Sequence, residues 1–547
     1  MNVATLIVKY LELKWVQRVY GLIGTSVLDL VDALKDSSIR YVSTRLDQSA
    51  ASMAAGEGKT TGRPGVAVVH GGPGFLNALT ALAAAYKDSV PLVLISGAVK
   101  RRMSGLNSWL EVKQLEIASR VSKASYRIDR QADAARKFSD AYATASASPQ
   151  GPVFVEVPED VWRLEAGDIL NGEEVRTSLP SEDDVDYVLR LLEGAKSPLI
   201  LAGGGVNNER GSRLLREFAE NHNVPVCTTG NGRGAMPEDS PLCLGRVGFG
   251  GGNTAADSAI QECDALIGMG CGVSDVTTYG YNFMPRGDVV AVTLDEEASL
   301  KPVPYSRLIR CDAVSFMESL SGAQSGFRVD EGWLRRLASS RGAWEAALEG
   351  AAARRYESFV NPASFFRELD ASMQGDAIVA AGQGLHVIYA HDFIRVRRPA
   401  SFIASTNLGA MGFALPAAVG AKMANKEREV FAVVGDGEFM MSVAELETIS
   451  RERVGVKVVV VNDNSYRVLL MRQKIQKMGR VHGTLHTNPD VMKLGAAFGV
   501  ESLVLDRDSE IKRAVSFIIS GGGPKLLELR VSQEDMPPTN VEASLRF

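Results

Sequence analysis

Short apolar runs alternate with amphipathic segments along most of the chain, and this alternation is the first guide to the fold. Segments with the helical spacing of apolar residues begin at Ser26, Asp47 and Gly74, each a small, polar or acidic residue of the kind that opens helices. Because strands alternate with helices, the pattern predicts a parallel sheet covered on both faces. The apolar runs of strand length in this part of the chain are 18–24, 39–45, 65–72 and 90–97.

The same alternation returns twice further along the chain. A second set of apolar runs begins at 197–206 and continues to about Cys311, and a third set extends from Pro362 to about Val531. We therefore predict an α/β fold made of three doubly wound parallel-sheet domains. The predicted domain boundaries are 1–165, 185–322 and 355–535.

Composition limits the classes of function. The chain of 547 residues is 45% hydrophobic and 23% charged, which is ordinary for a globular protein. Its formal net charge of −5 offers no basic surface for nucleic acid, and no apolar run is long enough to cross a membrane. The five cysteines are odd in number and lack CxxC spacing, which favours reduced thiols over disulfides or a zinc site. We expect a cytoplasmic protein with no nucleic-acid or membrane partner.

Two acidic turns follow apolar strands in the third domain. Asp436 lies in a Gly-Asp-Gly turn and Asp463 in an Asn-Asp-Asn turn, 463 − 436 = 27 positions later. The carboxyl ends of parallel strands meet at one edge of a sheet, and ligands of open α/β sheets bind at that edge. Oxygen donors combined with main-chain N–H groups suit a hard cation that is bridged to a phosphate.

Three segments together resemble the superfamily of acetolactate synthase, pyruvate oxidase and benzoylformate decarboxylase, which use thiamine diphosphate. The resemblance covers nearly the whole chain, and it implies pyrimidine-binding, central nucleotide-fold and diphosphate-binding domains in that order. It also implies a homodimer or homotetramer whose active site lies at the subunit interface. The segments that carry the resemblance are the two acidic turns, TRLDQSAASMAAG at 44–56 and NLGAMGFALPAAVGA at 407–421.

The resemblance assigns a magnesium site and a cofactor-binding set. The magnesium ligands would be Asp436, Asp463 (where the family usually has Asn) and the main-chain carbonyl of Ser465. Glu438 stands where many relatives have a phosphate-binding Ser, and it is either a functional group or a solvated acid at a helix start. Met411 would be the apolar wedge under the cofactor, or else a core residue. The cofactor-binding candidates are Gln383, Gly409, Met411, Gly435, Gly437, Glu438, Ser465 and Tyr466.

Four residues of the first domain are catalytic candidates. Asp47 replaces the Glu that protonates the aminopyrimidine in the family, and its side chain is shorter by about 1.5 Å. It is alternatively the N-cap of the next helix. His70 matches an active-site His of benzoylformate decarboxylase and would carry protons, or it packs under the following turn. Thr25 and Ser26 are candidate substrate-side hydroxyls.

Other residues typical of acetolactate synthases are replaced in this sequence. Leu110 stands where those enzymes have Gln, and Arg472 stands where they have Trp, so both are tentative substrate contacts. Arg472 is either a binder of a substrate carboxylate or phosphate, or a surface charge. The segment 268–280 aligns with an FAD-binding turn but lacks the Arg of many FAD-binding members, which argues against FAD.

The resemblance implies an enzyme that uses thiamine diphosphate and Mg²⁺ to decarboxylate a small-molecule 2-oxo acid, followed by carboligation as in acetolactate synthase. The alternatives are a simple 2-oxo acid decarboxylase like benzoylformate decarboxylase, which His70 and Leu110 favour, and a cofactor-binding pseudoenzyme. A dehydrogenase is disfavoured because the glycines after 197–202 do not complete a GxGxxG motif. The sequence does not name the 2-oxo acid.

Overall fold

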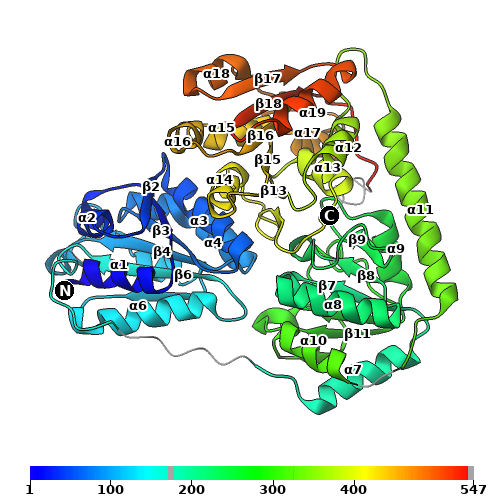
Figure 1. The fold of residues 1–547 in the computed structure, drawn as a ribbon, viewed down its shortest axis with the longest axis horizontal. Coiled ribbons are helices and arrows are strands. Elements are labelled where there is room, and N and C mark those ends of the chain that lie inside the picture. Colours follow the sequence, from blue (N-terminus) through cyan, green and yellow to red (C-terminus); the bar gives the residue numbers. More distant parts are fainter. Residues whose placement is uncertain (170–177, 324–325, 540–547) are drawn as a thin grey trace. The chain divides into compact units, whose positions relative to one another are not determined.

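A computed structural model describes residues 1–169, 178–323 and 326–539, and within these residues it contains three six-stranded parallel sheets (Figure 1). The predicted α/β fold of three parallel-sheet domains is confirmed. The chain divides into two compact units, which we describe separately. Unit 1 comprises Met1–Arg176, Asn407–Glu427 and Met441–Val456, and unit 2 comprises Thr177–Thr406, Arg428–Met440 and Lys457–Phe547.

Unit 1 contains the first sheet, whose strand order is β2-β1-β3-β4-β6-β5. The central strands are continuous runs of buried apolar residues, as expected for parallel strands covered on both faces. The direction of strand addition reverses between β1 and β3, so the loops after these strands flank the position where doubly wound sheets bind ligands. The strands are β1 (Arg18–Gly21), β2 (Arg40–Ser43), β3 (Gly65–Val69), β4 (Leu92–Ala98), β5 (Ala124–Arg127) and β6 (Pro152–Pro158).

The helices of unit 1 come from both ends of its sequence. The predicted helix at Ser26 is a 3₁₀ turn, Thr25–Val27, that leads directly into an α-helix. The predicted helix at Asp47 begins at that residue, and the one predicted at Gly74 begins one residue earlier, at Pro73. The helices are α1 (Val3–Leu13), α2 (Leu28–Lys35), α3 (Asp47–Thr61), α4 (Pro73–Lys87), α5 (Gln114–Ala118), α6 (Gln131–Ser146), α14 (Ala414–Ala424) and α16 (Glu445–Glu452).

Helices α3 and α14 pack at very close range because small residues line their contact. A Cβ on Gly56 of α3 would overlap the carbonyl oxygen of Ala417, and one on Gly420 of α14 would overlap that of Met53. Absence of a side chain therefore allows the two backbones to meet. This packing holds the loop before α14 beside the start of α3.

Unit 2 contains the second sheet, whose order is β12-β11-β10-β7-β8-β9. Its reversal lies between β7 and β10, where the two following loops touch: a Cβ on Gly203 would overlap Cys271 and the carbonyl oxygen of Gly270. The strands are β7 (Pro198–Ala202), β8 (Val226–Thr228), β9 (Cys243–Arg246), β10 (Ala265–Met269), β11 (Asp288–Val292) and β12 (Tyr305–Ile309). The helices are α7 (Glu182–Gly194), α8 (Glu209–His222), α9 (Thr254–Glu262), α10 (Ala313–Gly322) and the long connection α11 (Glu331–Ala353).

The third sheet, also in unit 2, has the order β14-β13-β15-β16-β18-β17, which repeats the order of the first sheet. Its reversal lies between β13 and β15. The strands are β13 (Ile378–Ala381), β14 (Phe402–Ile403), β15 (Val430–Gly435), β16 (Lys457–Asn462), β17 (Glu501–Leu505) and β18 (Lys525–Arg530). The helices are α12 (Pro362–Ser372), α13 (Leu385–Phe393), α15 (Asp436–Ser442), α17 (Arg467–Gln476), α18 (Val491–Phe498) and α19 (Ile511–Ile519).

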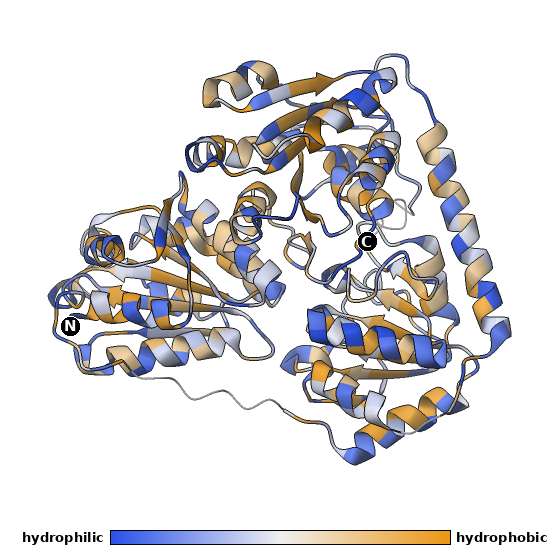
Figure 2. Cartoon of the chain, in the orientation of Figure 1, coloured by the Kyte–Doolittle hydropathy of each residue, from blue (hydrophilic) through white to orange (hydrophobic). Residues whose placement is uncertain are grey.

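Figure 2 shows hydrophobic residues concentrated along the strands, and hydrophilic residues along outer helices such as α8. The buried strand residues form the core of each sheet, and the adjoining loops are free to carry polar groups. Among the described residues, no helix is long and apolar enough to cross a membrane.

Candidate active site

The reversal point of the first sheet carries a hydrogen-bonded pair, Ser26 and His70. Ser26 follows β1 and is buried, and His70 directly follows β3. The Ser26 hydroxyl lies 2.8 Å from His70 Nδ1, and its oxygen accepts the Gly71 N–H at 2.9 Å. The Ser26 main-chain N–H also points at Nδ1, at 3.5 Å, so Nδ1 acts as an acceptor and the ring proton is assigned to Nε2. Burial lowers the pKa of His70, so the ring is a neutral donor through Nε2.

Asp47 is a buried carboxylate close to this pair. It is the first residue of α3, and Leu46, not Asp47, is the N-cap. Its Oδ2 accepts a long hydrogen bond of 3.4 Å from Asn77, whereas Oδ1 is buried without a hydrogen-bond partner in the described chain. A Cβ on Gly74 would lie only 2.8 Å from Oδ1, so glycine keeps this space open. Burial raises the pKa of Asp47, and the unpaired oxygen fits a ligand nitrogen that shares a proton.

The loop before α14 presents main-chain groups beside the start of α3. Gln48 donates from Nε2 to the carbonyl oxygen of Met411 at 3.2 Å. Gly409 and Gly412 have φ values of 73° and 77°, which an L side chain would strain. Met411 itself is half-buried, so it is not an ordinary core residue. The structure thus brings Gln48, the neighbour of Asp47, into contact with the Met411 loop. Thr25 is exposed, next to the buried Ser26.

Leu110 lies in a loop that packs on the glycine turn after His70. Its φ of 70° places a branched side chain in the left-handed region, an uncommon and strained state. A Cβ on Gly72 would lie 2.5 Å from the Leu110 carbonyl oxygen. Gln114 also fixes this turn, because its Oε1 accepts the Gly72 N–H at 3.0 Å. The Leu110 side chain is half-buried, and the close approach of the Leu110 backbone to Gly72 fixes its position.

In unit 2, Asp436 lies within a group of side-chain oxygens after β15 and β16. Asp436 Oδ2, Asn462 Oδ1 and Asn464 Oδ1 lie 2.7, 3.1 and 3.0 Å from the amide nitrogen of Asn488. An amide nitrogen has only two protons to donate, yet three oxygens converge on it. Oxygen donors converging in this way suit a hard cation. His486 also contacts Asp436 Oδ2, with its Nε2 at 3.0 Å.

Asp463 makes its own contacts with Ser465 and Arg467. Its Oδ1 accepts from the Ser465 hydroxyl at 2.6 Å, and its Oδ2 lies 3.6 Å from Arg467. Burial raises the pKa of Asp463, and the negative charge of Asp436 acts in the same direction. Among the described residues, no three His, Cys, Asp or Glu side chains are arranged as a metal site. A cation here would therefore use amide and main-chain oxygens in addition to carboxylates, and such a donor set fits Mg²⁺.

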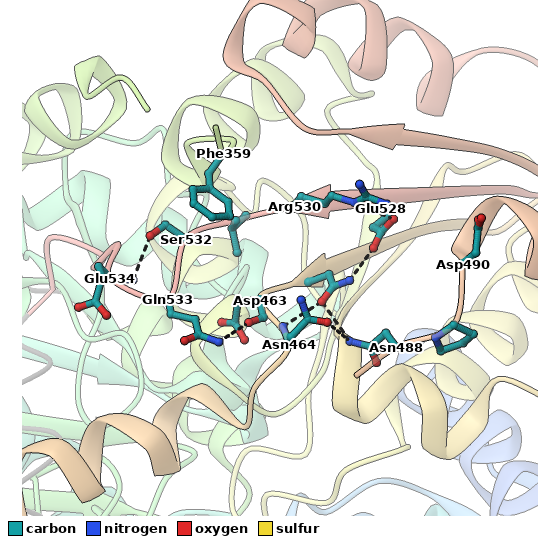
Figure 3. A pocket seen from close by; sticks show the side chains of 13 residues that line it. Phe359, Asp463, Asn464, Asn488, Asp490, Glu528, Arg530, Ser532, Gln533 and Glu534 are labelled. Carbon is teal, nitrogen blue, oxygen red and sulfur yellow. Dashed lines mark hydrogen bonds and ion pairs between the residues drawn. The ribbon is translucent and has the colours of Figure 1, made fainter. Parts of the chain in front are cut away.

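A cavity of about 700 Å³ adjoins these turns (Figure 3). Asn462, Asp463 and Asn488 contribute to its lining, and Glu528 and Gln533 line it from β18 and the segment after it. Gln533 donates to the Asp463 carbonyl oxygen at 2.7 Å, which fixes the second acidic turn against this segment. The cavity is wide enough for a small-molecule ligand, and most of the residues that line it are polar.

Glu438 and Gln383 meet at the reversal point of the third sheet. Glu438 is 1% exposed, and its carboxylate accepts the main-chain N–H of Gln383. The interpretation of Glu438 as a solvated acid is therefore wrong. His386 lies beside it and accepts the Gly435 N–H at Nε2, 3.1 Å away; burial lowers the pKa of this histidine to about 3.

The remaining candidates lie around the same turns. A Cβ on Gly437 would lie 2.5 Å from the Tyr466 ring, so glycine lets Tyr466 approach. Tyr466 in turn packs against the His486 ring with centroids 4.9 Å apart. Ser465 is buried and pairs with Asp463. Arg472 lies partly buried on α17, with its Nε atom unpaired in the described part of the chain.

Sequence reasoning missed Asn77, His386, His486 and Asn488. The last two belong to a polar segment without strand or helix, and they contact Asp436 across 50 and 52 positions. The only local signal was the Asn-Pro-Asp step that ends with Asp490, the N-cap of α18. Nothing in such a step indicates which distant carboxylate it faces.

Comparison with known proteins matches three family profiles in order along the chain. The N-terminal TPP binding domain of thiamine pyrophosphate enzymes matches residues 1–118, the central domain 185–320, and the C-terminal TPP binding domain 382–529. The probable acetolactate synthase large subunit of Methanocaldococcus jannaschii is 31% identical over 98% of this chain and 93% of its own length. The acetolactate synthase isozyme 2 large subunit of Escherichia coli is 30% identical, with 97% and 96% covered. Acetolactate synthase from Arabidopsis thaliana chloroplasts is 30% identical, with 96% and 81% covered.

Proposed function

The chain belongs to the thiamine pyrophosphate enzymes, and from this membership we propose that it decarboxylates a 2-oxo acid and joins the remaining fragment to a second carbonyl compound, as an acetolactate synthase-like carboligase. The observation that carries the proposal is the similarity to acetolactate synthases over 96–98% of the chain, with all three family domains in order. Thiamine diphosphate supplies, when bound, the electron sink that such bond cleavage needs.

The residues of unit 1 support two parts of the proposed reaction, the activation of the cofactor and the transfer of protons. Asp47 holds an unpaired oxygen in a buried position, where a carboxyl of raised pKa can share a proton with the aminopyrimidine. The Met411 loop offers main-chain partners next to it. His70, held by Ser26, presents Nε2–H as a donor toward the substrate carbonyl.

The residues of unit 2 support metal and phosphate binding. The proposed Mg²⁺ ligands are Asp436, Asp463 and the main-chain carbonyl of Ser465. The amide oxygens of Asn462 and Asn464 lie around the same carboxylate as additional donors. The protein is proposed to work as a homodimer or homotetramer with the active site at the subunit interface. The five free thiols agree with a cytoplasmic location.

A second candidate function is simple decarboxylation with release of an aldehyde. The Ser26–His70 pair favours it, because a donor with a defined tautomer at the reversal point can deliver a proton to the product. Leu110 favours it as well, because an apolar side chain stands where acetolactate synthases have a polar Gln.

One experiment separates these functions. The purified protein is incubated with thiamine diphosphate, Mg²⁺ and a panel of 2-oxo acids, with and without a second carbonyl compound, and CO₂ and products are measured. Carboligation predicts coupled 2-hydroxy ketones or acetohydroxy acids, whereas decarboxylation predicts free aldehydes. Asp47→Asn should lower either activity, because an amide cannot share a proton in the same way. Absence of CO₂ release from every acid would contradict both functions and leave a cofactor-binding pseudoenzyme.

A further inference from the structure

A carboxylate of the protein occupies the reversal point of the third sheet. Gln383 follows β13 and Glu438 lies in the first turn of α15, directly after β15. Sheets of this kind bind their ligands between the loops that follow the two strands at the reversal. The Glu438 carboxylate bridges these two loops by accepting the Gln383 N–H.

The surroundings of Glu438 are shaped around that carboxylate. A Cβ on Gly382 would overlap Oε2, so the absence of a side chain at Gly382 makes the room for it. His386 Nε2 lies 3.9 Å from Oε2, but this nitrogen already accepts the Gly435 N–H and so carries no proton. The imidazole is therefore neutral.

We propose that Glu438 is an internal anion that occupies the position of a cofactor phosphate oxygen at the Gln383 N–H, so that thiamine diphosphate binds only after displacing it. The inference rests on the proposed function, and it assigns a role to a residue that departs from the phosphate-binding Ser of relatives. It follows that this chain binds the diphosphate more weakly than the same site would without the carboxylate.

The physical reason is competition between two anions for one donor. A main-chain N–H that serves the Glu438 carboxylate is not available to a phosphate oxygen. Two like charges held a few ångströms apart in a partly buried site also repel each other, which corresponds to an affinity loss on the order of 10–100-fold. A neutral side chain at position 438 removes the repulsion, and Gln keeps an acceptor for the same N–H.

The test is isothermal titration of the full-length protein with thiamine, thiamine monophosphate and thiamine diphosphate, each in the presence of Mg²⁺. Glu438→Gln and Glu438→Ser are compared with the unaltered chain. The matched control is Glu429→Gln, because Glu429 also accepts a main-chain N–H (from Gln374, at 2.7 Å) but lies next to the opposite end of β15. Circular dichroism and thermal unfolding verify that each variant is folded.

We expect both Glu438 variants to bind thiamine diphosphate about 10–100-fold more tightly, to gain less for the monophosphate and to leave thiamine unchanged. Glu429→Gln should bind all three ligands as the unaltered chain does. Equal or weaker diphosphate binding by both folded variants overturns the inference while leaving the proposed function intact. Failure of the unaltered chain and every variant to bind any of the three ligands overturns both.

Discussion

At the scale of single residues, the charge of Asp47 is unfavourable in the folded chain. Burial raises its pKa in the folded chain, so the folded state holds the proton more strongly than the unfolded state. The contribution of Asp47 to the free energy of unfolding is therefore fully present below the pKa of the unfolded state, near 3.9. It is lost as the pH rises through the higher pKa of the folded state. A group that destabilises its own fold at neutral pH is common at functional sites.

We expect Asp47→Asn to be more stable than the unaltered chain at pH 7 and equal to it near pH 3. Thermal unfolding followed across this pH range measures the difference. Asn77→Ala is the control, since it removes the partner of Oδ2 but keeps the charge, and it should not gain stability at pH 7. A stability gain for Asp47→Asn that is the same at both pH values would show that charge is not its cause.

His70 and Ser26 give a second prediction at this scale. His70→Ala should slow turnover by roughly 10²–10⁴-fold, the usual contribution of one general acid or base, with little change in cofactor affinity. Ser26→Ala removes a hydrogen bond that only neutral His70 can accept, so the His70 pKa should rise. Proton NMR titration of His70 measures that shift, with Thr25→Ala as the neighbouring control. An unchanged His70 pKa in Ser26→Ala would contradict the assigned tautomer.

At the scale of elements, the contact between α3 and α14 positions the Met411 loop beside Asp47. Gly56→Ala places a methyl group where the Ala417 carbonyl oxygen lies, and overpacking of this kind costs about 1–3 kcal/mol. Gly350→Ala in α11 is the matched control, because its added methyl meets open space and alanine favours helix by roughly 0.5–1 kcal/mol. We expect the thermal midpoint to fall for Gly56→Ala and to rise slightly for Gly350→Ala. A fall of equal size in both would point to a general effect of alanine.

At the scale of the whole molecule, unit 2 exposes large apolar side chains on and just after α17, close in sequence to the second acidic turn. Leu469, Ile475 and Met478 are 54%, 50% and 91% exposed. Large apolar side chains exposed close together in the sequence are candidates for an interaction site. Their exposure in one chain agrees with the proposed subunit interface.

Light scattering should therefore give at least twice the mass of one chain. Double substitution of Ile475 and Met478 by Glu should shift the protein toward monomer, because charges resist burial in an apolar interface. Leu300→Glu, at a residue that is 81% exposed near the second sheet, is the control and should leave the mass unchanged. A single-chain mass for the unaltered, cofactor-saturated protein would exclude the proposed assembly.

The sequence was sufficient to predict the central strands and the turns that follow them. β15 and β16 are unbroken apolar runs because both faces of a parallel sheet are covered, and Asp436 and Asp463 stand directly after them. Some edge strands were harder to predict. β5 and β17 are only partly buried, so their apolar pattern is weak, and β14 spans just two residues. Helix α1 was not predicted either, although seven of its residues are buried.

Which polar groups meet was decided by the tertiary structure alone. The sequence placed Glu438 at a helix start and left its role open, because local pattern reports secondary structure and not what a side chain faces. Burial against Gly382 and the contact with Gln383 arise from loops 55 positions apart. The same holds for Asn488 and Asp436, and for Ser26 and His70. Parallel strands joined through helices bring such loops to one edge of a sheet, and only the order of the strands determines which of them become neighbours.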